Sequence, residues 1–175
     1  MTITAANTHK EIRYGHRDGP GKGREYACRQ DLYFHRRGGH FVEMDTNGSV
    51  GIITGSIYGT AKDIFGWAIV GKDTVKHSWK AKATTDDGFP SLVFVVRGLE
   101  DKFEIPWNAT SASLSKSYIG RGCTLSTANE ANATASSLQK AYYQGTDASC
   151  NLIIEDVDTT NNTVIVRIKP DNLQH

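Results

Sequence analysis

Several features that identify particular classes of protein are scarce in this chain of 175 residues. It has three cysteines, an odd number without a Cys-x-x-Cys pair, so free thiols in a reducing compartment are expected. No apolar run has the length of a transmembrane helix, and the first residues lack the apolar segment of a signal peptide. The formal net charge of +1 gives no overall argument for nucleic acid. We therefore expect no secretion signal and no membrane partner, and a nucleic-acid partner is disfavoured.

The positive charge that is present is concentrated at the start of the chain. Residues 1–40 contain eight basic side chains (Lys10, Arg13, Arg17, Lys22, Arg24, Arg29, Arg36, Arg37) against four acidic ones (Glu11, Asp18, Glu25, Asp31). Glycine and proline are frequent in the same stretch, at residues 19–23, which predicts a loop or a flexible segment. We therefore predict an extended basic N-terminal arm, residues 1–37, that lies on a partner.

The pattern changes at residue 38, where short apolar stretches begin to alternate with turn residues. Residues 40–44 and 49–54 flank Asn47-Gly48, a pair that supplies the positive φ angles of a tight turn, and they predict a hairpin. Residues 65–70 predict a single apolar strand.

Two further antiparallel pairs are predicted nearer the C-terminus. The apolar strand 91–96 is followed by turn residues at 98–101 and by strand 102–107, and the last pair is 152–157 with 163–168. One helix is predicted, over residues 133–143. No internal repeat is evident in the sequence.

These elements predict an all-β fold for residues 38–175, a small barrel or sandwich of antiparallel hairpins. A division into two β subdomains, 38–110 and 111–175, is the alternative to a single one. The side chains predicted to fill the core are Val42, Ile52, Ile57, Phe65, Trp67, Ile69, Val93, Val95, Phe103, Ile105, Ile153, Val164 and Val166. Trp67 and Trp107 could instead anchor an interface, although core packing is the better prediction for either.

The stretch GWAIVGKD, residues 66–73, has the glycine and lysine spacing of a phosphate-binding loop. Such a loop needs serine or threonine after the lysine to bind magnesium, and here that residue is Asp73. The four residues between the glycines are apolar, which is typical of a buried strand. We interpret the stretch as a strand and a turn.

Other combinations of reactive residues are also better explained by structure than by chemistry. Cys28, His35, His40 and Glu43 could approach a metal, but their spacing fits no zinc pattern. The chain contains no Gly-x-Ser-x-Gly motif, and its adjacent carboxylate pairs lie in turns or on opposite faces of a strand. We therefore predict no catalytic, cofactor-binding or metal-binding residues, no cofactor, and a protein that is not an enzyme.

Aromatic residues lie among the N-terminal arginines, which is a pattern found in proteins that bind single-stranded nucleic acid. The aromatic residues are Tyr14, Tyr26, Tyr33 and Phe34. A small barrel that carries such a strip could hold a strand by stacking and by charge. The acidic residues in the same segment and the lack of a known RNA-binding signature make this the weaker interpretation.

The stretch HFVEMDTNGSVGIITGSIYGTAKDIFGWAIVGKD resembles the decoration proteins of tailed bacteriophages, also called capsid cement proteins. The words that carry the resemblance are Gly39-His40-Phe41-Val42 and the run from Gly59 to Gly66, which reads GTAKDIFG. The later segments FEIPWNATSA, IGRGCTL and LIIEDVDTTNNTVIVRI are also similar to virion proteins that end in a hairpin. The resemblance covers about residues 38–170 and does not include the basic arm.

The resemblance implies a structural virion protein that binds and stabilises the outer surface of a capsid. Its partners would be the major capsid protein and further copies of itself, as a dimer or trimer, and its location would be the virion. A cement protein needs no active site, because many shallow contacts are multiplied by symmetry. Six arginines of the arm are the predicted partner contacts: Arg13, Arg17, Arg24, Arg29, Arg36 and Arg37. The alternatives are another virion component, such as a head–tail connector or a tail protein, and a small nucleic-acid-binding barrel.

Overall fold

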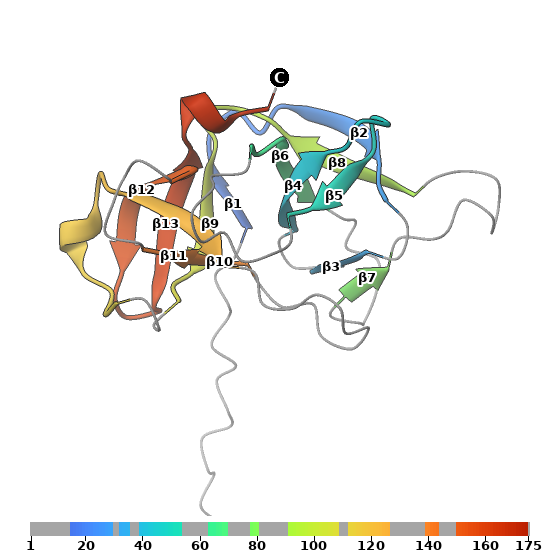
Figure 1. Cartoon of the computed structure of the whole chain (residues 1–175). Helices are drawn as coiled ribbons and strands as arrows, with labels where there is room; N and C mark the ends of the chain where they lie inside the picture. The colour runs from blue at the N-terminus through green and yellow to red at the C-terminus, as the bar shows by residue number, and fades with distance from the viewer. Residues whose placement is uncertain are drawn as a thin grey trace, which may run out of the picture.

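The computed structural model describes residues 15–29, 32–35, 39–53, 63–69, 78–80, 91–108, 112–126, 139–143 and 150–174. Two antiparallel sheets lie side by side, and a small ladder pairs β3 (Tyr33–His35) with β7 (Ser78–Lys80) (Figure 1). Within these ranges the helical elements are two short 3₁₀ turns, η1 (Lys116–Tyr118) and η2 (Pro170–Asn172). The predicted all-β fold class is therefore confirmed.

The first sheet curls round until its two ends meet. Its strands lie in the order β2 (Gly23–Ala27), β8 (Leu92–Val96), β6 (Gly66–Ile69), β4 (His40–Met44) and β5 (Val50–Ile52). Directly after β2, Cys28 forms a parallel bridge with Val50, and the Arg29 N–H donates to the Val50 carbonyl at 2.9 Å. This contact links the first strand of the sheet to its last. We call this unit the first barrel.

The second sheet curls in the same way. Its order is β1 (Gly15–Asp18), β9 (Lys102–Pro106), β13 (Thr163–Ile168), β12 (Leu152–Asp158), β10 (Gly122–Ser126) and β11 (Lys140–Tyr142). Directly after β9, Trp107 forms a parallel bridge with Ala141, and the Asn108 N–H donates to the Ala141 carbonyl at 2.9 Å. Strands β9 to β13 form the second barrel, and β1 is an additional strand that pairs with the outer edge of β9.

The two barrels have the same topology. Numbered along the chain within each barrel, the strands lie in the order first, fifth, fourth, second, third, and the third closes onto the end of the first. The registers agree as well, because Ala27 pairs with Leu92 and Pro106 pairs with Thr163, each one residue before its parallel bridge. The structure is thus a tandem repeat that the sequence does not reveal.

Apolar side chains fill the first barrel and the space between it and the second. The interior of the first barrel contains Val42, Ile52, Phe65, Val93 and Val95 among others. A larger cluster fills the second barrel and continues onto the outside of the first, where Trp67 stacks on Phe103 with ring centroids 5.2 Å apart. Because one cluster joins both units, they pack as one body.

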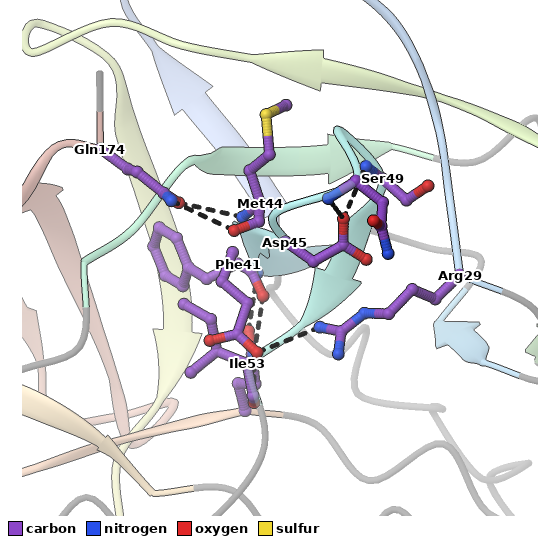
Figure 2. A network of polar contacts seen from close by, with 10 residues as sticks. Arg29, Phe41, Met44, Asp45, Ser49, Ile53 and Gln174 are labelled. Atoms are coloured by element: carbon purple, nitrogen blue, oxygen red, sulfur yellow. Dashed lines mark hydrogen bonds and ion pairs between the residues drawn. The ribbon is translucent and has the colours of Figure 1, made fainter.

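The ends of the described chain cross between the two barrels. β1 belongs to the second barrel although β2, which follows it, opens the first. After β13 the chain returns to the first barrel, where Leu173 bridges Ile64 and the Gln174 side chain bonds both the N–H and the carbonyl of Met44, at 2.9 and 3.1 Å (Figure 2). A second amide, that of the buried Gln139, makes the same two-point contact with the backbone of Phe41, at 2.7 and 3.0 Å. These contacts hold the barrels together by hydrogen bonds from side chains to the backbone as well as by apolar packing.

The first and the last of the predicted hairpins are present in the structure, but the turn at Asn47-Gly48 differs in detail. Strands β4 and β5 pair as expected, as do β12 and β13. Of the two turn residues Asn47 and Gly48, only Gly48 has a positive φ, of 79°. The Asp45 carboxylate accepts hydrogen bonds from the N–H groups of Asn47 and Ser49 at 2.9 Å. A short acidic side chain therefore holds the loop in place of a second left-handed residue.

The predicted hairpin of residues 91–96 with 102–107 is wrong, because β8 lies in the first barrel and β9 in the second. The turn residues between them form a corner, at which the buried Asp101 donates its N–H to the Gly98 carbonyl. The chain thus changes sheets at residues 98–101, and not near the subdomain boundary predicted at 110. Turn residues alone do not distinguish a hairpin from a change of sheet.

The prediction of a separate arm over residues 1–37 is wrong for its described part. β1 pairs with β9 and β2 with β8, so residues 15–27 are integral strands of both sheets. The glycines at 19 and 21, with φ of 106° and 60°, make the turn between these strands. Residues 1–14 lie outside the described residues.

Three smaller predictions also need correction or remain outside the structure. Residues 140–142 of the predicted helix form strand β11, and residues 133–138 lie outside the described residues. Ile153 and Ile69 are half-buried, whereas the buried residues of β12 are Leu152, Ile154 and Val157. Ile57 lies outside the described residues, and the other predicted core side chains are buried.

Candidate interaction surface

The predicted contact arginines that the structure describes are used largely within the fold. Nε of Arg17 donates to Glu104 at 2.5 Å, and an Nη of Arg29 donates to Glu43 at 3.0 Å. The guanidinium of Arg24 lies 4.7 Å from the centre of the Tyr26 ring and also bonds its hydroxyl. Arg13, Arg36 and Arg37 lie outside the described residues. The described part of the segment is therefore no free basic strip, because two of its three arginines are neutralised by acidic residues of the barrels.

Among the described side chains, those considered as metal ligands form no group that could hold an ion. Cys28 and His40 are both buried, and the His40 ring packs edge-on against Phe34 with centroids 5.9 Å apart. In the part of the chain that the structure describes, no group of three His, Cys, Asp or Glu residues could hold an ion. The side chain of His35 is not among those described.

The three cysteines are free thiols in buried positions. Burial raises the pKa of Cys28 to about 11. Burial and the nearby Cys150 also raise the pKa of the Cys123 thiol. A nucleophilic cysteine needs a lowered pKa, so both of these side chains are suited to packing and unsuited to catalysis.

One polar contact at the corner between the barrels was missed from the sequence. Nε2 of His16 lies 2.9 Å from Oδ1 of the buried Asp101, which also accepts the Gly21 N–H at 2.8 Å. The partners are 85 residues apart, so no local pattern predicts them. The contact fixes β1 to the corner between the barrels and is a structural one.

The first half of the stretch that resembled a phosphate-binding loop is a strand, as predicted, and residues 70–73 lie outside the described residues. Gly66 to Ile69 form β6, between β4 and β8 in the first barrel. A side chain at Gly66 would meet the Val96 carbonyl at 2.5 Å, so this glycine allows close packing of strands. Trp67 and Trp107 are both buried and belong to the core, so neither is an interface anchor.

One surface of the first barrel carries unusual apolar exposure. Leu92 and Phe94 on β8 expose 53% and 39% of their surface, although the residues between and after them are buried. They point outward from the barrel, Phe94 next to Glu25 of β2 and Leu92 next to Ala27. We call these four residues the β2–β8 face. Large apolar residues grouped on an outer surface are typical of a protein interaction site.

The β2 strand beside this face has an outer edge to which no described strand is paired. In the sheet order, β2 is the first strand, and its first three residues, Gly23 to Glu25, are exposed. An open edge presents N–H and carbonyl groups that can pair with another chain. The face and the edge together form the candidate site.

Comparisons with known proteins give no independent indication of function. The chain has no significant match to a protein-family model, to a curated protein or to a solved structure. Among the described residues, none of the helical elements has the length and apolar character needed to cross a bilayer. The function is therefore argued from the residues and from the resemblance to virion proteins.

Proposed function

We propose that the protein is a structural component of a bacteriophage virion that binds the outer surface of the capsid and stabilises it. The observation that supports this proposal is the β2–β8 face, an exposed apolar surface beside an open strand edge on a rigid all-β body. A protein with this construction is suited to shallow, repeated protein contacts, which symmetry multiplies on a capsid. The capsid itself is proposed from the resemblance of residues 38–170 to decoration proteins.

The structure changes which residues are proposed to make the contact. Arg17 and Arg29 are paired within the fold, so their charges contribute little to a partner. Leu92 and Phe94 offer apolar area that becomes buried in a complex, at about 25 cal/mol per Å². We therefore assign the principal contact to the β2–β8 face.

The test is co-sedimentation of the purified protein with phage heads that lack it. Saturable binding, with protection of the heads against rupture by heat or chelator, is the expected result. Phe94→Asp places a charge on the β2–β8 face and is expected to lower the affinity at least tenfold. Ile119→Asp is the matched control, because Ile119 is 47% exposed but lies beyond η1 in the second barrel.

The result distinguishes this function from the alternatives. Absence of binding to heads overturns the proposal, and equal losses in the two aspartate variants overturn the assignment of the face. Free single-stranded and duplex DNA are included, because binding to DNA that is lost at high salt would indicate a nucleic-acid-binding barrel.

A further inference from the structure

The tandem repeat allows the open edge of β2 to be compared with an equivalent edge that is occupied. Cys28 and Trp107 are equivalent because each forms the bridge that closes its barrel. Counting back three residues along each strand makes Glu25 equivalent to Glu104, and Gly23 is likewise equivalent to Lys102. In the second barrel these positions are covered by β1, whose Gly15 pairs with Glu104 and Asp18 with Lys102.

The backbone of β2 presents the same groups outward. The backbone groups of Lys22 and Cys28 point toward β8. The Lys22 carbonyl accepts a hydrogen bond from the Arg97 N–H at 3.0 Å, and the Cys28 N–H donates to the Ser91 carbonyl at 2.9 Å. Alternate residues of a strand direct their N–H and carbonyl groups to opposite sides. The groups of Gly23 and Glu25 therefore point away from β8, and no described strand pairs with them.

The two equivalent glutamates differ in what covers them. Glu104 is 3% exposed and accepts from Arg17 of β1 at 2.5 Å and from the Thr163 hydroxyl at 2.6 Å. Glu25 is exposed and has no ion pair among the described residues. A strand placed on β2 as β1 is placed on β9 would bring its own basic residue to Glu25.

We propose that the outer edge of β2 receives an extended segment of another protein, antiparallel to β2, with an arginine or lysine that pairs with Glu25. Residues flanking that segment would cover Leu92 and Phe94. A second copy is the less suitable occupant, because its β1 is already held on its own β9 by the contacts of His16 and Arg17. The partner's identity as a capsid protein rests on the proposed function, whereas the edge and its charge preference rest on the repeat alone.

A synthetic peptide tests the edge directly. Residues 12–20 of this chain, IRYGHRDGP, contain a strand that already pairs with the equivalent edge, and the peptide is added to the intact full-length protein. Backbone amide resonances of Gly23 and Glu25 are expected to shift on titration. The Arg17→Glu peptide is expected to bind at least fivefold more weakly, and Glu25→Lys protein is expected to reverse this preference.

Three outcomes would overturn the inference. The first is that the peptide does not bind. The second is that the shifted amide resonances are confined to Lys102 and Glu104, which would mean that the peptide exchanges with β1. The third is that the protein self-associates in sedimentation equilibrium through the β2 edge. Glu25 is exposed, so its substitution is not expected to prevent folding. Binding of the peptide without binding to heads would refute the capsid as the partner and leave the β2 edge as a binding site. Binding to heads that is unchanged in Glu25→Lys would refute the β2 edge as the binding site and leave the capsid as the partner.

Discussion

Replacement of Arg17 is expected to destabilise the fold, since this arginine is the ionic partner of a buried carboxylate. The side chain of Glu104 is only 4% exposed, whereas that of Arg17 is 42% exposed. In Arg17→Met the apolar part of the side chain is kept, but the Glu104 carboxylate retains only the hydroxyl of Thr163 as a donor among the described contacts.

The magnitude lies between two limits. Breaking a fully buried pair by removing one partner costs about 3–5 kcal/mol. A solvent-exposed pair contributes about 0–1 kcal/mol. Because one partner is buried and the other is almost half exposed, we expect a loss of about 2 kcal/mol in the free energy of unfolding. For a chain of this size that corresponds to a decrease in Tm of roughly 4–8 °C.

The assay is urea denaturation of the wild type, Arg17→Met, Glu104→Gln and the double variant. Glu104→Gln removes the charge and keeps an oxygen for Thr163, so the double variant is expected to be more stable than Arg17→Met. Arg24→Met is the matched control, because Arg24 lies over Tyr26 and has no acidic partner among the described residues. Its expected cost is about 0.5 kcal/mol, the lower value for an exposed cation–π contact.

A coupling energy between residues 17 and 104 below about 0.5 kcal/mol would refute this reasoning, because that is the additivity expected of independent sites. Equal losses for Arg17→Met and Arg24→Met would refute it as well. In either case the arginine of β1 would be available to a partner, as the sequence alone suggested.

Three further predictions follow from buried groups and from one turn. Gln139→Ala is expected to lower the free energy of unfolding by about 2–3 kcal/mol, because the buried Phe41 N–H loses its acceptor while the Phe41 carbonyl keeps only the Ile53 N–H among the described contacts, and hydrogen exchange at the Phe41 amide should accelerate. The thiol of Cys28, with a pKa of about 11, should react with a disulfide reagent roughly 100-fold more slowly at pH 8 than an ordinary thiol. Since the pKa of Cys28 is raised in the folded state, the contribution of this thiol to the free energy of unfolding is fully present below the unfolded pKa near 9 and decreases as the pH rises toward 11. Denaturation at pH 8 and at pH 10.5 would reveal the decrease. Gly48→Ala should cost about 1 kcal/mol from its φ of 79° alone, because an added Cβ would meet nothing within 4 Å, and Gly48→Asn should cost less in the same thermal unfolding assay.

The sequence was sufficient for structure that depends on local patterns. Turn residues and alternating apolar residues predicted the hairpins that became β4 with β5 and β12 with β13, because neighbouring strands joined by short turns tend to pair. The strand over Gly66 to Ile69 was predicted for the same reason, from an apolar run too short for a helix.

Structure that depends on distant residues was not predicted. The change of sheet at Asp101 depends on contacts with His16 and Gly21, which lie 85 and 80 residues earlier, and nothing in the local turn sequence distinguishes it from a hairpin. The repeat escaped notice because equivalent positions share burial and pairing but few identities, as Cys28 and Trp107 illustrate.

The candidate site was only partly within reach of sequence reasoning. Arginines near the start of the chain were taken as partner contacts because their acidic partners lie far away in sequence, such as Glu104 for Arg17. Phe94 lies in a continuous apolar run, residues 92–96, and its exposure depends on the absence of a covering element over β8 among the described residues. Exposure of this kind is a property of the tertiary structure.

The crossing of the chain ends between the barrels has a consequence for how the protein folds during synthesis. When residue 97 has been made, the five strands of the first barrel exist, but the contacts of Leu173 and Gln174 with Ile64 and Met44 must wait for the rest of the chain. Strand β1, made before all of these, has no place to pair until β9 emerges from the ribosome. We therefore expect the nascent first barrel to remain sensitive to protease, and the two barrels to become resistant together, only after residue 174 has been added.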